Sequence, residues 1–161
     1  MPRSLPQKTL LRDELVAQLE AQLATARAAH AAAIEGATHP EAKAENDKDT
    51  RGLEQSYIAR GQAQRVAELE AAIGDLAALA LRTFGEDAPI AMSALVVVDE
   101  DGDPHRYWIA PHGGGNVLAG DVQVVTPSSP LGRALLGKQA GDEVELALAG
   151  KRRTLEITDV T

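Results

Sequence analysis

Acidic side chains gather in one short stretch in the first half of the chain. Glu41, Glu45 and Asp49 follow one another at intervals of four residues, and Asp47 lies between the last two. If a helix begins near Pro40, this spacing places the first three on one helical face. Clustered carboxylates repel one another and gain from a cation between them, and Mg²⁺ prefers carboxylate oxygens as ligands. The stretch therefore predicts a surface that can lend ligands to a metal ion.

The same stretch also has an ordinary structural interpretation. Acidic residues near a helix N-terminus interact favourably with the helix dipole. Pairs such as Lys43 with Asp47 and Asp47 with Arg51 are typical solvated contacts between successive turns. The residues alone leave both interpretations open.

Two long helical patterns surround the acidic stretch. The first repeats leucine every fourth residue from Leu11 to Leu23, which is typical of a helix with one buried face. Gly36 is a stop signal and Pro40 suits a first helical turn. The second pattern alternates spacings of three and four, as in a coiled coil, at Val66, Leu69, Ile73, Leu76 and Ala80. We therefore predict an antiparallel helical hairpin over residues 1–83, with its tip near residues 36–49.

The second half, residues 84–161, changes to short apolar runs separated by turn residues. Strands are predicted at residues 94–98, 107–109, 122–125, 143–149 and 154–158. Residues 99–104 form a predicted hairpin turn, and residues 150–152 separate the last two strands. A short helix, Leu131 to Leu136, is predicted between Ser129-Pro130 and Gly137. The fold class is thus α+β, with a helical hairpin first and a small β domain with one short helix second.

Charge and composition limit the classes of partner. The chain has 161 residues and a net charge of −8, and residues 84–161 carry 6 basic and 12 acidic side chains. This balance argues against broad attachment to nucleic acid phosphates and favours a protein or a positively charged channel. There is no cysteine, so disulfides and thiolate sites are excluded. No apolar run suits a membrane span or signal peptide, so we expect a cytoplasmic protein.

One run of residues has a specific resemblance. Ser129 to Lys138 (SPLGRALLGK), followed by Gly141-Asp142-Glu143-Val144, closely resembles the C-terminal signature of the Gre (GreA/GreB-like) transcript-cleavage factors. The preceding strand, which ends in Val124-Val125-Thr126-Pro127, and the order of the two halves are also similar. The motif itself is compatible with a purely structural role, in which proline starts a helix, glycine ends it and the leucines are buried.

The resemblance carries expectations for fold and partner. It implies a C-terminal domain similar to the FK506-binding prolyl isomerases, without their activity. It also implies a monomer that binds RNA polymerase through the secondary channel, contacts nascent RNA only indirectly, and is neither an enzyme nor a holder of its own cofactor. The expected polymerase-docking residues are those of the motif: Ser129, Pro130, Leu131, Gly132 and Arg133.

The resemblance also gives the acidic stretch a role. In the cleavage factors the hairpin tip carries an Asp and a Glu separated by two residues, which hold a second Mg²⁺ jointly with the polymerase and stimulate cleavage of backtracked RNA. Aligning Glu45-Asn46 with the family places Ala42 at the position of the Asp. Glu45 is therefore the carboxylate that carries over as a shared Mg²⁺ ligand. Glu41, Asp47 and Asp49 are candidates to assist it.

Several functions remain open on the sequence. The first is an elongation factor that stimulates RNA cleavage, and the alternative is a regulator that binds polymerase in the same way without stimulating cleavage. An independent prolyl isomerase and a dimerising coiled coil are competing hypotheses from other classes.

Overall fold

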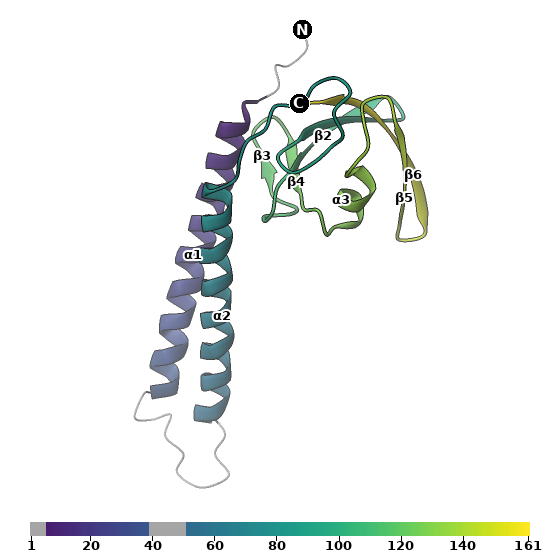
Figure 1. Ribbon diagram of the computed structural model, residues 1–161. Coiled ribbons are helices and arrows are strands. Elements are labelled where there is room, and N and C mark those ends of the chain that lie inside the picture. The colour runs from purple at the N-terminus through teal and green to yellow at the C-terminus, as the bar shows by residue number, and fades with distance from the viewer. Residues whose placement is uncertain (1–5, 39–50) are drawn as a thin grey trace. The chain divides into compact units, whose positions relative to one another are not determined.

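The computed structural model describes residues 6–38 and 51–161, which form two long helices followed by a sheet with one short helix (Figure 1). The elements occur in the order α1 (Lys8–Thr38), α2 (Arg51–Ala77), β1 (Leu95–Glu100), β2 (Asp103–Ile109), β3 (Val117–Leu118), β4 (Val122–Val125), α3 (Pro130–Leu135), β5 (Glu143–Leu148) and β6 (Lys151–Val160). This order confirms the predicted α+β class.

Contacts divide the chain into two compact units. One unit runs from Ala17 to Gly74, and the other joins the first turns of α1 to Asp75–Thr161. The first is called the hairpin unit below and the second the β unit. A division by contacts does not test where an independently folding domain begins. The predicted domain boundary near residue 84 therefore stays a prediction.

The hairpin unit buries one apolar stripe on each helix. Its buried members are Leu19, Leu23, Ala26 and Ala33 of α1 with Leu69 and Ala72 of α2. Polar contacts also join the helices: Arg27 Nη2 lies 2.9 Å from Glu70 Oε1, and Arg65 Nη2 donates over 3.2 Å to Gln22 Oε1. Both contacts are exposed, so each adds little stability. Burial of the stripes is the main interaction between the two helices.

The predicted ends of the helices differ from the structure by a few residues. Gly36 lies inside α1, which continues to Thr38. Its φ is not in the left-handed region, so it does not act as a helix cap. The helix α2 ends at Ala77. Ala80 was predicted to belong to the buried coiled-coil pattern of this helix, but it lies beyond the helix and is exposed. The Leu79 amide donates to Leu76 O over 3.2 Å, which closes the last turn. Within the described ranges, neither long helix is apolar over enough length to cross a bilayer.

The β unit contains a six-stranded sheet in the order β3-β4-β2-β1-β6-β5. Neighbouring strands are antiparallel except β2 and β4, which run parallel. The short strand β3 was missed by the sequence prediction, because two residues are too few for an alternating pattern. The sheet places the consecutive β1–β2 and β5–β6 hairpins side by side, joined through β1 and β6.

Two tight turns close these hairpins. Asp101 and Gly102 have φ values of 53° and 89°, and Glu100 pairs with Asp103 around them. Ala149 and Gly150 have φ values of 51° and 76° in the other hairpin. Two successive residues with positive φ are typical of a type I′ turn, whose twist matches that of the strands. The first turn agrees with its predicted place. The second was predicted too late, because Lys151 and Arg152 belong to β6.

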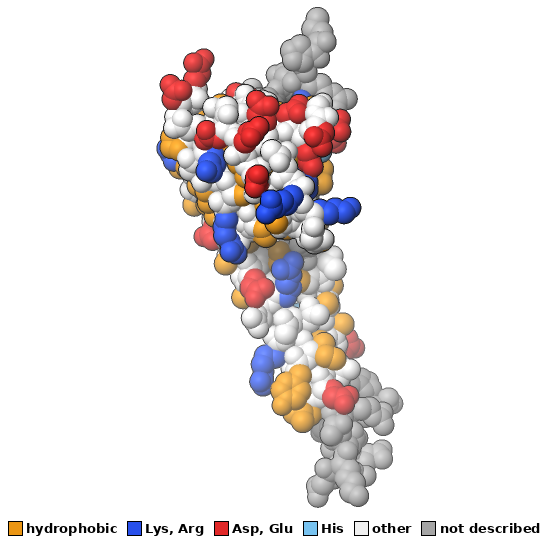
Figure 2. Space-filling model, turned by 90° about the vertical axis from the view of Figure 1, so that its right-hand side faces the viewer, with side chains coloured by type: hydrophobic (Ala, Val, Ile, Leu, Met, Phe, Trp, Pro, Cys, Tyr) orange, Lys and Arg blue, Asp and Glu red, His pale blue; other side chains and the backbone are white. Residues whose placement is uncertain are grey.

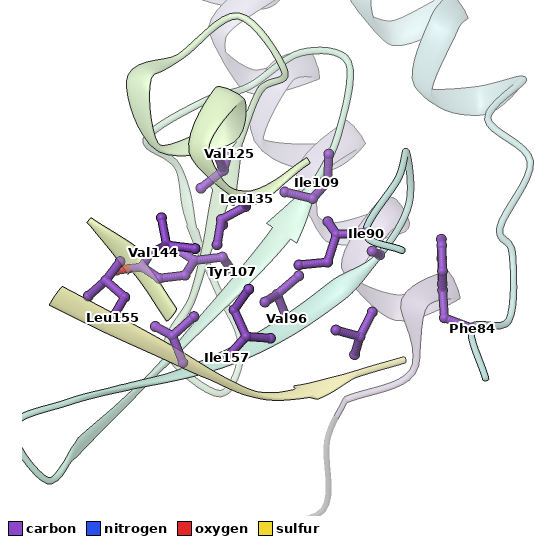
Figure 3. Close-up of a cluster of buried hydrophobic side chains, with 13 residues drawn as sticks. Phe84, Ile90, Val96, Tyr107, Ile109, Val125, Leu135, Val144, Leu155 and Ile157 are labelled. Carbon is purple, nitrogen blue, oxygen red and sulfur yellow. The ribbon is translucent and has the colours of Figure 1, made fainter. Parts of the chain in front are cut away.

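One face of the sheet packs against α3. Alternating residues of β1, β2 and β6, such as Val96, Tyr107 and Ile157, form a buried cluster with Leu135 of α3 (Figure 3). Phe84 and Ile90, from the segment before β1, extend the cluster. Burying a side chain of this size contributes about 1.5–3 kcal/mol before the entropy of ordering is subtracted. The cluster therefore fixes α3 on the sheet.

Side chains on the other face meet the first turns of α1. Trp108 is fully buried, and its indole nitrogen donates over 3.2 Å to Ser93 O. Leu15 of α1 packs so closely on Gly113 that a Cβ at the glycine would lie 2.7 Å from the leucine side chain. Glu14 accepts a hydrogen bond of 2.9 Å from the Ala119 amide. The first turns of α1 are thus part of the β unit.

The helix α3 is held by its N-terminal residues. Ser129 is the N-cap: its hydroxyl accepts from the Gly132 amide over 3.0 Å and donates to Thr126 O over 2.8 Å. Pro130 occupies the first turn, where no amide donor is needed. A Cβ at Gly132 would lie 1.9 Å from Thr126 O. Glycine is therefore required where α3 meets the preceding loop.

Replacing Gly132 with alanine tests this close approach. Helix propensity alone favours alanine over glycine by roughly 1 kcal/mol. We expect Gly132→Ala instead to destabilise the β unit by roughly 2–4 kcal/mol, because the methyl group displaces a backbone carbonyl and weakens the serine cap. Urea unfolding followed by fluorescence of the single tryptophan, Trp108, measures the change.

Gly85→Ala is the matched control. A Cβ at Gly85 would meet no heavy atom within 4 Å beyond the adjoining residues, and the φ of this glycine is not positive. This substitution should change the unfolding free energy by less than about 1 kcal/mol, toward greater stability. Equal stability of the two variants would contradict the role given to Gly132.

Candidate functional site

The predicted tip carboxylates lie outside the described residues. Glu41, Glu45, Asp47 and Asp49, together with Ala42, fall in the segment 39–50 between α1 and α2. Their role as Mg²⁺ ligands therefore stays a prediction. In the rest of the chain, residues 6–38 and 51–161, no three His, Asp or Glu side chains are grouped closely enough to hold a metal ion.

The hairpin unit exposes apolar side chains next to this segment. Leu53, Tyr57 and Ile58 of α2 are 56%, 60% and 49% exposed, and Ile34 of α1 is 44% exposed. Leu53 and Tyr57 are separated by one helical turn and share a face. The ring of Tyr57 lies 5.7 Å from the guanidinium of Arg60. Large apolar groups gathered at an exposed place are typical of a surface that binds protein.

The predicted docking residues surround the N-terminus of α3, but not all of them reach the surface. Ser129, Pro130 and Leu131 line a pocket of about 220 Å³ between α3 and the sheet. Gly132 is buried against the Thr126 carbonyl. Arg133 is exposed, and its guanidinium donates to Ser128 O over 2.9 and 2.7 Å. The structural interpretation thus holds for Pro130 as the first residue of α3, and Ser129 and Gly132 are structural as well. Pro130 and Leu131 also line the pocket and remain available to a ligand.

Strands supply the rest of the pocket. Tyr107 of β2, Gln123 of β4, Leu146 and Leu148 of β5 and Arg153 of β6 lie along its wall. Leu148 is 39% exposed, although it is a large apolar residue. An apolar lining with a few polar groups at the edge is typical of a site for a protein side chain or a small ligand.

The edge of the pocket carries one strong ion pair. Arg153 donates from Nε to the two carboxylate oxygens of Glu100 over 2.9 and 3.1 Å, and its Nη2 also bonds Glu100. These hydrogen bonds lower the pKa of Glu100, and they raise the pKa of Arg153. His105 Nε2 lies 3.9 Å from the same carboxylate. Arg153 is thus held in place at the pocket with its charge largely satisfied.

Sequence reasoning missed these strand residues. The sequence assigns no role to Arg153, which follows two further basic residues; Lys151 and Arg152 are exposed, whereas Arg153 is half-buried. Glu100 and Arg153 are 53 residues apart in the chain. The two residues meet because β1 pairs with β6 in the sheet. No local pattern in a single sequence predicts this pairing of distant strands. In the sequence, only Tyr107 could have pointed to this pocket, because it is one of few aromatic residues in the chain.

Acidic side chains predominate on one visible face of the β unit. Figure 2 shows them gathered over the upper part of the sheet domain, with basic side chains mostly below them. The exposed acidic residues of the β unit include Asp101, Asp103, Glu143, Glu145 and Glu156. This distribution agrees with the net charge of the second half. It favours contact with a basic protein surface.

Comparison with known proteins adds a family. The family model described as "Transcription elongation factor, GreA/GreB, C-term" matches residues 87–161. A transcription elongation factor GreA of Sulfurovum sp. is 33% identical over 114 residues, which span 70% of this chain and 64% of that protein. The GreA of Sphingopyxis alaskensis is 27% identical over 150 residues, which span 89% of each protein. The match to the first relative thus covers slightly less than two thirds of its length.

Among solved structures, that of GreA factor homolog 1 (Gfh1) of Thermus thermophilus aligns with 91% of this chain and 94% of its own. The identity is 21% and the TM-score 0.40, so the family assignment rests on the sequence matches. The matched β domain contains the motif that lines the pocket, and helices precede it in the expected order. The C-terminal domain of the chain, residues 87–161, belongs to the family of Gre-type transcription elongation factors.

Proposed function

We propose that this chain binds RNA polymerase and acts as a transcription elongation factor that stimulates cleavage of backtracked RNA. The observation that carries the proposal is the placement of the family motif, because Ser129, Pro130 and Leu131 line an open pocket on the β unit. In this proposal the pocket docks on the rim of the secondary channel. With this partner the protein works in the cytoplasm as a monomer, without a cofactor of its own.

Two surfaces support a protein partner. The acidic surface of the β unit suits a basic rim, and its charges would speed association more than they tighten binding. The exposed Leu53, Tyr57 and Ile58 at the end of the hairpin unit suit apolar contacts inside a channel. Neither surface has the dense positive charge needed to attach to RNA phosphates.

The chemistry is proposed for the segment between the helices. Glu45 would provide a carboxylate to a second Mg²⁺ at the polymerase active site, with Glu41, Asp47 or Asp49 nearby. The metal would activate the water that cuts the RNA, so the polymerase would remain the enzyme. This chain's part would be to hold an oxygen ligand in place.

A regulator that occupies the channel without stimulating cleavage is the second candidate. The observation that favours it is Ala42, which stands where the family has an Asp. A methyl group has no oxygen to offer a metal. One carboxylate fewer would weaken the shared Mg²⁺ site while leaving the docking surfaces unchanged.

Cleavage of labelled RNA in a stalled, backtracked polymerase complex at fixed Mg²⁺ distinguishes the candidates. We expect the wild-type chain to shorten the RNA and Glu45→Ala to lower the cleavage rate at least about tenfold, because a metal ligand is lost. Glu20→Ala, which removes an exposed carboxylate from α1, is the matched control and should leave the rate unchanged.

Two outcomes would count against the first candidate. If the cleavage rate with Glu45→Ala equals that of the wild type, Glu45 is not a ligand of the second Mg²⁺. Polymerase binding without any shortening would favour the regulator, and Ala42→Asp should then introduce cleavage.

Pro130→Lys tests the docking pocket. Pro130 is exposed at its edge, so a lysine there removes an apolar contact and opposes a basic partner surface. We expect the dissociation constant for polymerase to rise at least about tenfold, which equals roughly 1.4 kcal/mol. Fluorescence anisotropy of the labelled chain with core polymerase measures it.

Gln139→Lys adds the same charge at an exposed position that does not line the pocket, and serves as the control. Its affinity should stay within about twofold of the wild type, since it lies outside the proposed contact. Equal loss in both variants would show a general effect of charge, and unchanged affinity of Pro130→Lys would exclude the pocket from docking.

A further inference from the structure

Near the start of α1, the side chains of Lys8 and Arg82 lie over the ring of Phe84. Lys8 Nζ is 4.6 Å from the centre of the Phe84 ring, and the guanidinium carbon of Arg82 is 5.0 Å from the same centre. Lys8 also donates a hydrogen bond of 2.6 Å to the main-chain carbonyl of Arg82. Two positive charges thus share a small volume within the β unit.

No carboxylate balances these charges in the described part of the chain. Neither Lys8 nor Arg82 takes part in any of its ion pairs, and the first turn of α1 contains no acidic residue. The partial positive charge of a helix N-terminus adds to the repulsion on Lys8. Burial, and then the charge of Arg82, lower the pKa of Lys8 to about 8. Holding Lys8 charged is therefore costly without an anion.

A pocket lies beside the two cations. It has a volume of about 460 Å³, is open to solvent, and is lined by both basic residues and by the polar Gln7, Thr9 and Thr83. No acidic side chain is among its lining residues. Thr161 also lines it, and no ion pair of the described residues joins it to either cation. The pocket shares no residue with the one under α3, so it is separate from the proposed docking site.

We propose that this pocket binds a small phosphate-bearing anion between Lys8 and Arg82. A phosphate dianion matches the two positive charges, and the forked guanidinium suits two of its oxygens. The neighbouring threonine hydroxyls and the glutamine amide provide further hydrogen-bond donors. The net charge of −8 disfavours the backbone of a nucleic acid as the source of the phosphate. This binding activity goes beyond polymerase binding and does not depend on it.

The test follows Lys8 by NMR in the full chain with ¹³C-labelled lysines. Inorganic phosphate and pyrophosphate are titrated at constant ionic strength, with chloride as the reference anion. We expect a saturable change in the Lys8 Cε signal and a rise in the pKa of Lys8 from about 8, because a bound anion favours the charged amine. A response equal to that of chloride, or none, would overturn the proposal.

Two variants localise the site. Lys8→Met and Arg82→Met each keep an apolar stem on Phe84 but remove one charge, and Lys138→Met removes an exposed charge elsewhere in the β unit. Phosphate should raise the unfolding midpoint of the wild type and of Lys138→Met by mass action. Affinity should fall at least about tenfold in Lys8→Met and Arg82→Met, since each loses a charge-assisted contact. Equal stabilisation of all four proteins would contradict the site.

The last titration uses a single-stranded RNA oligonucleotide in place of the small anions. If it shifts the Lys8 signal at lower phosphate-group concentration than pyrophosphate does, the ligand is a nucleic acid backbone and the small-anion assignment is wrong. Weaker binding of the oligonucleotide than of pyrophosphate supports the proposal.

Discussion

The position of α3 depends on one close contact, between the Gly132 backbone and the Thr126 carbonyl. Because no side chain separates them, the helix lies low enough on the sheet for Leu135 to enter the buried cluster. The same placement leaves Pro130 and Leu131 at the rim of a pocket whose opposite wall is formed by strands. A structural requirement of the motif therefore creates the surface that is available for binding. Packing and the proposed docking role are therefore not alternatives for these residues, because the packing of α3 places Pro130 and Leu131 at the pocket.

Basic residues of the β unit differ in whether a carboxylate balances their charge. One face of the β unit is rich in acidic side chains, yet the edge of its pocket carries Arg153, which Glu100 holds by several hydrogen bonds. Such a paired arginine keeps its geometry when a partner approaches, because little side-chain freedom remains to be lost. Lys8 and Arg82 are different, because they lie together without a carboxylate among the described ion pairs. Paired charges of the first kind stabilise a fold, whereas unbalanced charges of the second kind point to a ligand.

Membership of the C-terminal domain in the Gre-type family limits the function without deciding the chemistry. The proposed docking residues lie in the matched region, residues 87–161, and the proposed Mg²⁺ ligands lie in a different part of the chain. If the proposal holds, two proteins with the same β domain and hairpin would bind polymerase alike and could differ in cleavage. The difference depends on very few oxygen atoms, because a metal site gains or loses a ligand with one side chain. Ala42 matters for this reason.

Local patterns in the sequence determined the two helices, most of the strands, the Asp101-Gly102 turn and the limits of α3. Each depends on neighbouring residues: a leucine every fourth position, a proline before a helix, or two turn residues between apolar runs. The acidic balance and the family motif were also visible in the chain itself. Only the tertiary structure decided which motif residues reach solvent, that Arg153 meets Glu100, and that Lys8 shares Phe84 with Arg82. These contacts join residues 53 and 74 positions apart, and chain folding, not local preference, brings such residues together.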